Sequence, residues 1–126
     1  MPLEEVYPDI PDNEGCVLQV TIYVAPDQLP KFFEAYRKVY DACVSEEECT
    51  FFSVYEDPEE PGKLSWVEHW TKNPKWLFAV QFKKKEYAEY FKITEPMFVK
   101  PREFRWLRQV EGYTTLRKGA KGVTEL

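Results

Sequence analysis

The sequence predicts one α+β domain in which two helical regions cover one face of a four-stranded sheet. Four segments alternate apolar and polar residues with the period of a strand, and two segments repeat apolar residues with the period of a helix. The segments follow one another as β-α-β-β-α-β, the order of a ferredoxin-like sandwich. A length of 126 residues suits one such domain, because a chain of this size can bury a core without dividing.

The chain begins with an arm, a strand and a helix. Residues 1–15 are rich in proline and acidic residues, which predicts an extended N-terminal arm. Residues 16–24 (CVLQVTIYV) alternate and are rich in β-branched side chains, which predicts the first strand. Pro26 and Asp27 offer a turn, and apolar residues at helical spacing then predict an amphipathic helix that ends near Val44.

An antiparallel hairpin is predicted next. Residues 49–56 (CTFFSVYE) and residues 64–70 (LSWVEHW) have the composition and alternation of strands. The loop between them, residues 57–62, holds two prolines and a glycine. A connection this short favours antiparallel pairing of the two strands.

A second helical region follows the hairpin. Asn73 suits the N-cap position, and Pro74 suits the first helical position, where a missing N–H group costs nothing. The apolar stripe continues beyond a predicted break near Lys83, and residues 95–97 (EPM) end the region.

The last predicted strand covers residues 102–110 (REFRWLRQV), and residues 112–126 predict an irregular C-terminal tail. The folded domain is therefore placed at residues 16–111. Helices on only one face leave the other face of the sheet to be covered, and self-association is the commonest solution. We expect a homodimer.

Charge and composition exclude several classes of function. The chain has 17 Lys and Arg against 22 Asp and Glu, a net charge of −5, without the clustered basic face that nucleic-acid binding requires. No stretch approaches the roughly 18 apolar residues of a membrane span, and the N-terminus lacks the features of a secretion signal. Cys16, Cys43 and Cys49 form no CxxC pair, which favours free thiols in a reducing compartment. We expect a cytoplasmic protein with neither a nucleic-acid nor a membrane partner.

The sequence offers no recognisable site for a metal or a nucleotide cofactor. His69 is the single histidine, and the cysteines lack the spacing of metal ligands. Neither a phosphate-binding glycine loop nor the dinucleotide fingerprint is present. We expect no metal and no cofactor.

The strand at residues 64–70 holds the strongest candidate for chemistry. Alternation places Trp66, Glu68 and Trp70 on the same face of the sheet. If the helices bury that face, the loss of water raises the pKa of Glu68 towards a value useful for proton transfer. The alternative is a structural ion pair between Glu68 and an arginine, namely Arg102, Arg105 or Arg108.

The stretch LSWVEHWT at residues 64–71, a strand with a Glu-x-Trp pattern followed by a helix, resembles the strand signature of the antibiotic biosynthesis monooxygenase family. The resemblance covers residues 17–110. It implies a dimeric α/β barrel and an activity that needs neither metal nor flavin. In such oxygenases a substrate phenol is deprotonated in an apolar pocket, and the carbanion-like ring reacts with dioxygen.

The resemblance also suggests site residues. Trp70 matches the family's strand tryptophan, and Tyr55 matches a tyrosine on the preceding strand, which with Glu68 gives the expected catalytic set. Trp66 stands where such oxygenases have asparagine, and Trp76 stands where they have a tyrosine. Gln81 replaces a histidine that many relatives place in the following helix, and a glutamine cannot act as a base. The expected substrate-binding residues are Trp66, Trp76, Gln81 and Tyr90.

The leading hypothesis is a cofactor-independent monooxygenase that acts on a hydrophobic aromatic or polyketide-type small molecule. The aromatic fraction of 17% suits a pocket for a flat ligand, although the same rings also suit plain core packing. One alternative is a cyclase, isomerase or decarboxylase on the same barrel. Another is a non-catalytic protein that binds a hydrophobic metabolite. The haem-degrading branch of the fold is disfavoured, because it needs an axial histidine in the second helical region and His69 lies on a strand.

Overall fold

The computed structural model describes residues 4–125. It contains four strands and three α-helices, with short 3₁₀ turns at Pro26–Gln28, Gln81–Lys83 and Glu95–Met97. In chain order the strands and helices are β1 (Cys16–Val24), α1 (Leu29–Val44), β2 (Cys49–Glu56), β3 (Lys63–Trp70), α2 (Pro74–Ala79), α3 (Lys85–Thr94) and β4 (Phe98–Leu107).

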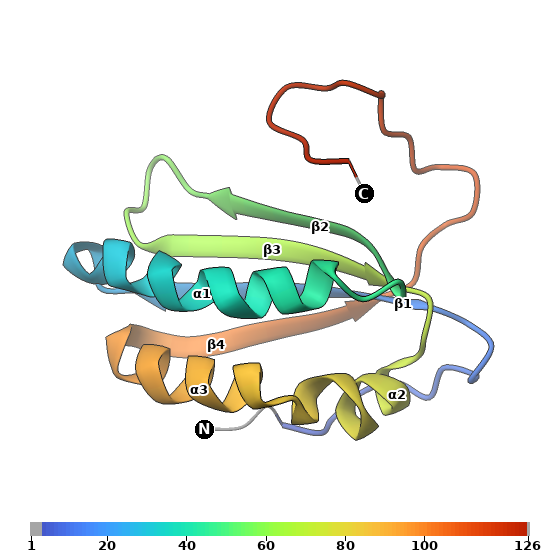
Figure 1. Ribbon diagram of the computed structural model, residues 1–126, viewed down its shortest axis with the longest axis horizontal. Helices are drawn as coiled ribbons and strands as arrows, with labels where there is room; N and C mark the ends of the chain where they lie inside the picture. Colours follow the sequence, from blue (N-terminus) through green and yellow to red (C-terminus); the bar gives the residue numbers. More distant parts are fainter. Residues whose placement is uncertain (1–3, 126) are drawn as a thin grey trace.

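The four strands form one antiparallel sheet in the order β2-β3-β1-β4. Figure 1 shows all three helices on the same face of this sheet, with α1 and α3 lying side by side across it. The arrangement confirms the predicted α+β, ferredoxin-like fold. The two outer strands, β2 and β4, have a strand neighbour on one side only.

Strand β1 is central because it can be buried on its helix-facing side along its whole length. Leu18, Val20, Ile22 and Val24 alternate along that side and are at most 2% exposed. Helix α1 covers them with its own buried stripe, which consists of Phe32, Tyr36, Val39 and Cys43. This pairing of a strand period with a helix period makes the main core.

The second helical region breaks where the sequence predicts. Asn73 caps α2, since its side-chain oxygen accepts a hydrogen bond from the Trp76 N–H at 3.0 Å. Val80 leaves the helical conformation, a 3₁₀ turn follows, and α3 begins at Lys85. The break near Lys83 is therefore confirmed, and it reorients the chain so that α3 packs beside α1.

The predicted bounds of the last strand were wrong. Residues 102–110 were expected, whereas β4 begins at Phe98 and ends at Leu107. Pro101 lies inside this strand, at a shift of register where Thr21 pairs with Glu103 and Tyr23 with Lys100. Because β4 is an edge strand and the register slips there, a residue without an N–H group is tolerated.

The N-terminal arm packs against its own chain. Ile10 is buried, and the Asn73 side chain donates hydrogen bonds to the Ile10 carbonyl oxygen at 2.8 Å and to Asp12 at 3.0 Å. Tyr7 stacks on Phe78 with ring centroids 5.4 Å apart. Within the described range 4–125, no helix combines the length and the apolar character needed to cross a bilayer.

Candidate functional site

Glu68 lies in the middle of β3 and faces the helices. It pairs across the sheet with Leu18 on one side and Phe52 on the other, and it is 5% exposed. Its Oε2 atom accepts a hydrogen bond from the Trp66 indole at 2.9 Å, and its Oε1 atom accepts one from the Trp70 indole at 2.8 Å. The strand period produces this clamp, since residues two apart point to the same side.

No arginine of the described chain forms an ion pair with this carboxylate. Arg102 pairs with Glu95 at 3.0 Å, and Arg108 pairs with Glu14 at 3.5 Å. Arg105 pairs across the sheet with Gln19. Gln19 alternates with the buried, helix-facing residues of β1, so both side chains lie on the face of the sheet opposite Glu68. The expectation of a structural ion pair at Glu68 is therefore not met, and neutral indole groups hold the carboxylate instead.

The surroundings of Glu68 change its acidity. Burial raises the pKa of Glu68 from the ordinary 4.5 to about 7, and the hydrogen bonds from Trp70 and Trp66 oppose that rise because they stabilise the charged form. A carboxyl group that titrates near neutrality can accept and release protons at working pH. Near neutral pH Glu68 is therefore present in both its protonated and its charged form.

Replacing Trp70 with phenylalanine should raise the pKa of Glu68 further. The change removes one N–H donor from the Oε1 atom and leaves the ring in the core, so the charged form loses stabilisation. The expected shift is about one pH unit. Carbon-13 NMR of the Glu68 carboxyl group measures it. Trp76→Phe is the matched control, because Trp76 packs on Trp70 at 6.2 Å and makes no hydrogen bond to Glu68; an equal shift in both variants would contradict the prediction.

Glu68 borders a partly open cavity of about 40 Å³. The cavity is lined by residues from all four strands, from α1, from α3 and from the turn before α3. Its volume is well below the roughly 150 Å³ of a cavity that admits benzene. Aromatic rings thus fill most of the space beside Glu68, and a whole ring can enter only if lining side chains move.

Two tyrosine hydroxyl groups at this cavity have no hydrogen-bond partner within residues 4–125. They belong to Tyr36 on α1 and Tyr90 on α3, and both residues are 5% exposed. The Thr94 hydroxyl lies near Tyr90, but it donates its own hydrogen bond to the Tyr90 carbonyl oxygen at 2.8 Å. Buried hydroxyl groups are normally paired, so these two call for an explanation.

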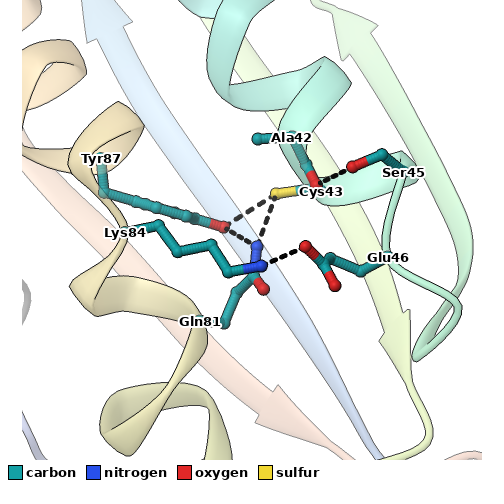
Figure 2. A network of polar contacts seen from close by, with 7 residues as sticks. All are labelled: Ala42, Cys43, Ser45, Glu46, Gln81, Lys84 and Tyr87. Atoms are coloured by element: carbon teal, nitrogen blue, oxygen red, sulfur yellow. Dashed lines mark hydrogen bonds and ion pairs between the residues drawn. The ribbon is translucent and has the colours of Figure 1, made fainter.

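The third tyrosine of the cavity, Tyr87, is engaged in a polar network (Figure 2). Its hydroxyl group lies 2.8 Å from the Cys43 Sγ atom and accepts a hydrogen bond from the Gln81 amide at 3.3 Å. Lys84 and Glu46 form an ion pair beside the network and join the turn before α3 to the end of α1. The network fixes the mutual position of the two helices.

The structure brings together only part of the predicted site. Trp66, Glu68 and Tyr90 line the cavity, and Trp70 reaches it through its hydrogen bond to Glu68. Gln81 is fully buried behind Cys43 and Tyr87. Trp76 packs against Trp70 and does not line the cavity.

Tyr55 is not at the cavity. It pairs with Ser65 on β3, so it points to the face of the sheet opposite Glu68, and it is 49% exposed. Val54 and Phe52 are the β2 residues on the Glu68 side, opposite Trp66 and Glu68. Within one chain Tyr55 cannot touch a ligand bound beside Glu68.

Three further residues of α1 and α3 complete the site and were not predicted as site residues. Tyr36, Cys43 and Tyr87 line the cavity. The helical period identifies Tyr36 and Cys43 as buried, but it does not tell which strand residue they meet. Among the described residues, no cluster of His, Cys, Asp and Glu is arranged to hold a metal ion.

Comparison with known proteins identifies the family. The model of the antibiotic biosynthesis monooxygenase family matches residues 16–83, which carry β1 to the turn before α3 and include Glu68. The chain belongs to the antibiotic biosynthesis monooxygenase family. A candidate monooxygenase of Pestalotiopsis microspora is 30% identical over 95 residues, which are 75% of this chain and 79% of that protein. These similarities support monooxygenase activity as the general function.

Solved structures of candidate antibiotic biosynthesis monooxygenases share the fold. The protein from Caulobacter crescentus superposes with a TM-score of 0.71 at 13% identity, covering 79% of this chain and 92% of that one. The protein from Nitrosomonas europaea gives a TM-score of 0.70 at 15% identity, covering 83% and 98%. At such low identity the likeness extends to the fold of the monooxygenase family and not to the substrate.

Proposed function

We propose that this chain is a cofactor-independent monooxygenase that oxidises a phenolic aromatic or polyketide-type small molecule, with Glu68 as the general base. The observation that carries the proposal is the buried carboxylate held by two indole N–H groups beside a cavity walled by aromatic rings. Its pKa of about 7 suits removal of a proton from a weakly acidic hydroxyl group.

The proposed reaction balances without a resident redox group. Glu68 takes the phenol proton, and the electron-rich phenolate carbon attacks dioxygen. The ring loses two hydrogen atoms and gains one oxygen atom as it becomes a quinone, while the second oxygen atom leaves as water. The substrate itself supplies the electrons that reduce dioxygen, so the protein needs only to bind, deprotonate and exclude water.

The apolar surroundings suit this chemistry. Phe52, Phe82, Phe91 and Phe104 line the cavity together with the Trp66 indole. Such a lining favours a flat hydrophobic substrate and dioxygen over water. The four phenyl groups are half-buried, and Phe52 on β2 lies at the opposite edge of the sheet from Phe104 on β4.

Oxygen consumption tests the proposal. The protein is mixed with hydroxylated naphthalenes and anthracenes in an oxygen-electrode cell, and products are analysed by mass spectrometry with ¹⁸O₂. One atom of ¹⁸O in the product and one in water are expected. Turnover of the same compounds under nitrogen would instead identify a cyclase, isomerase or decarboxylase. Binding without any turnover would identify a non-catalytic binding protein.

A homodimer is part of the proposal. All three helices lie on one face of the sheet (Figure 1), and the opposite face carries the half-buried side chains of Tyr23 and Val67. Apolar side chains on an uncovered sheet face favour association with a second copy.

Val67→Arg should separate the dimer into single chains. Val67 is half-buried in the middle of the uncovered face, between Gln19 and Ser53, and an arginine there would place two charges against each other across a symmetric contact. Light scattering coupled to size exclusion measures the mass. Ile93→Arg on the outer side of α3 is the control and should remain dimeric; a single-chain mass for the unmodified protein would refute the dimer.

A further inference from the structure

Tyr36 belongs to the buried stripe of α1. Its ring stacks on Phe32 with centroids 5.3 Å apart and packs on Trp66 at 4.9 Å. Trp66 is also one of the two donors to Glu68. The same indole therefore fixes the position of the Tyr36 ring and of the carboxylate at the cavity.

The Tyr36 hydroxyl is buried at the cavity and makes no hydrogen bond within residues 4–125. Burial raises the pKa of Tyr36 well above its ordinary value, with Tyr90 and Glu68 adding to the effect. The hydroxyl group therefore keeps its proton and remains a hydrogen-bond donor. A protein that buries such a donor without an acceptor loses stability, and groups of this kind gather at functional sites.

Glu68 offers the complementary group. Each carboxylate oxygen accepts one indole N–H, and an ionised carboxylate has about four acceptor positions in all. The Glu68 carboxylate therefore has acceptor positions left for a hydrogen bond from a ligand. One cavity thus combines an unpaired O–H donor with a carboxylate that can accept one more proton.

We propose that Tyr36 is a catalytic residue that donates a hydrogen bond to the hydroxyl oxygen of a bound phenol while Glu68 takes the proton of that hydroxyl. The O–H bond of the phenol breaks, a new O–H bond forms on Glu68, and the electron pair stays on the phenolate oxygen. Tyr36 stabilises that new negative charge, as an oxyanion-hole donor does. No redox partner is needed for this step.

The size of the cavity fits this arrangement. A space of about 40 Å³ holds a hydroxyl group and the adjoining ring edge but not a whole ring. The rest of the ring would then lie among the half-buried phenyl groups of Phe82, Phe91 and Phe104. The site would thus select a phenol whose hydroxyl group stands at an unhindered edge.

Binding of 2-naphthol and of its methyl ether tests the inference, which rests on the proposed function. Both probes are titrated under nitrogen at pH 8 and followed by difference absorbance, which distinguishes naphthol from naphtholate. In Tyr36→Phe the affinity for 2-naphthol should fall by about ten-fold or more and the naphtholate absorbance should disappear. The methyl ether should bind equally before and after the change.

Tyr40→Phe is the matched control. Tyr40 lies one turn further along α1 and packs edge-on against Phe52 at 5.0 Å, but it does not line the cavity. Its change should leave both probes unaffected. The melting temperature of Tyr36→Phe should equal or exceed that of the unmodified protein, because the change removes an unpaired buried hydroxyl group.

In the binding assay the inference is overturned by unchanged 2-naphthol binding in Tyr36→Phe, by an equal loss of both probes, or by no binding of 2-naphthol to the unmodified protein. Oxygen uptake is measured separately. Normal probe binding without oxygen uptake would refute the monooxygenase proposal and leave the role of Tyr36 in phenol binding intact. Oxygen uptake that persists unchanged in Tyr36→Phe would refute the role of Tyr36 alone.

Discussion

Replacing Glu68 with glutamine is expected to lower the rate of oxygen uptake by about 10²- to 10⁴-fold, the range that a general base contributes. The amide has nearly the same shape as the carboxyl group but cannot take a proton from the substrate. It still accepts a hydrogen bond from one of the two indoles, so the packing around Trp66 and Trp70 is retained. The measurement is initial oxygen uptake with a phenolic substrate that the unmodified protein turns over.

The pH profile sharpens this prediction. In the unmodified protein kcat/KM should rise with pH and level off above a midpoint near 7, because the charged form of Glu68 is the base. Glu56→Gln, at the exposed end of β2, is the control and should keep full activity. A Glu68→Gln variant that is folded and retains most of the oxygen uptake would exclude Glu68 as the base.

The folded protein should lose about 3 kcal/mol of stability between pH 4.5 and pH 7 through Glu68 alone. The folded-state pKa of about 7 lies above the ordinary 4.5, so in this window the folded protein holds a proton that the unfolded chain has released. Rising pH therefore favours unfolding. The contribution is fully present below pH 4.5, decreases up to about pH 7 and is constant above that.

Urea unfolding at intervals between pH 4 and pH 8 measures this effect. The unfolding free energy of Glu68→Gln is subtracted at each pH, which cancels the titration of all other groups. The thiols and phenols that interact electrostatically with Glu68 do not titrate in the window, because burial raises the pKa of each of them: Cys16, Tyr36, Cys43, Cys49, Tyr87 and Tyr90. A difference that does not change with pH would show that Glu68 is ionised at the same pH in the folded and the unfolded state.

The strands and helices follow from local patterns, and the errors arise where tertiary context decides. The strand at residues 16–24 was predicted with its true bounds, because alternation and β-branching agree along it. The start of β4 was missed, because Pro101 suggests a break unless one knows that the strand lies at the edge of the sheet. Edge position is a property of the assembled sheet and is not encoded locally.

The candidate site shows the same limit. The grouping of Trp66, Glu68 and Trp70 was predicted, because all three lie on one strand and its period alone places them together. Tyr36 and Tyr87 come from helices whose rotation over the sheet is set by packing, so their meeting with Glu68 could not be inferred. Tyr55 was chosen by similarity to a family position, and the register of β2 against β3 places it on the other face.

The open edge of the sheet also has a consequence for solubility. Strand β2 carries Phe51, Phe52, Val54 and Tyr55 on an edge with no further strand beside it within the described residues, a composition that favours pairing with another chain. Acidic residues flank it on both sides, at 46–48 before the strand and at positions 56, 57, 59 and 60 at its end and after it. Two such edges brought together would set carboxylates against carboxylates. Charges that flank an exposed apolar strand in this way oppose fibre-like stacking of strand edges.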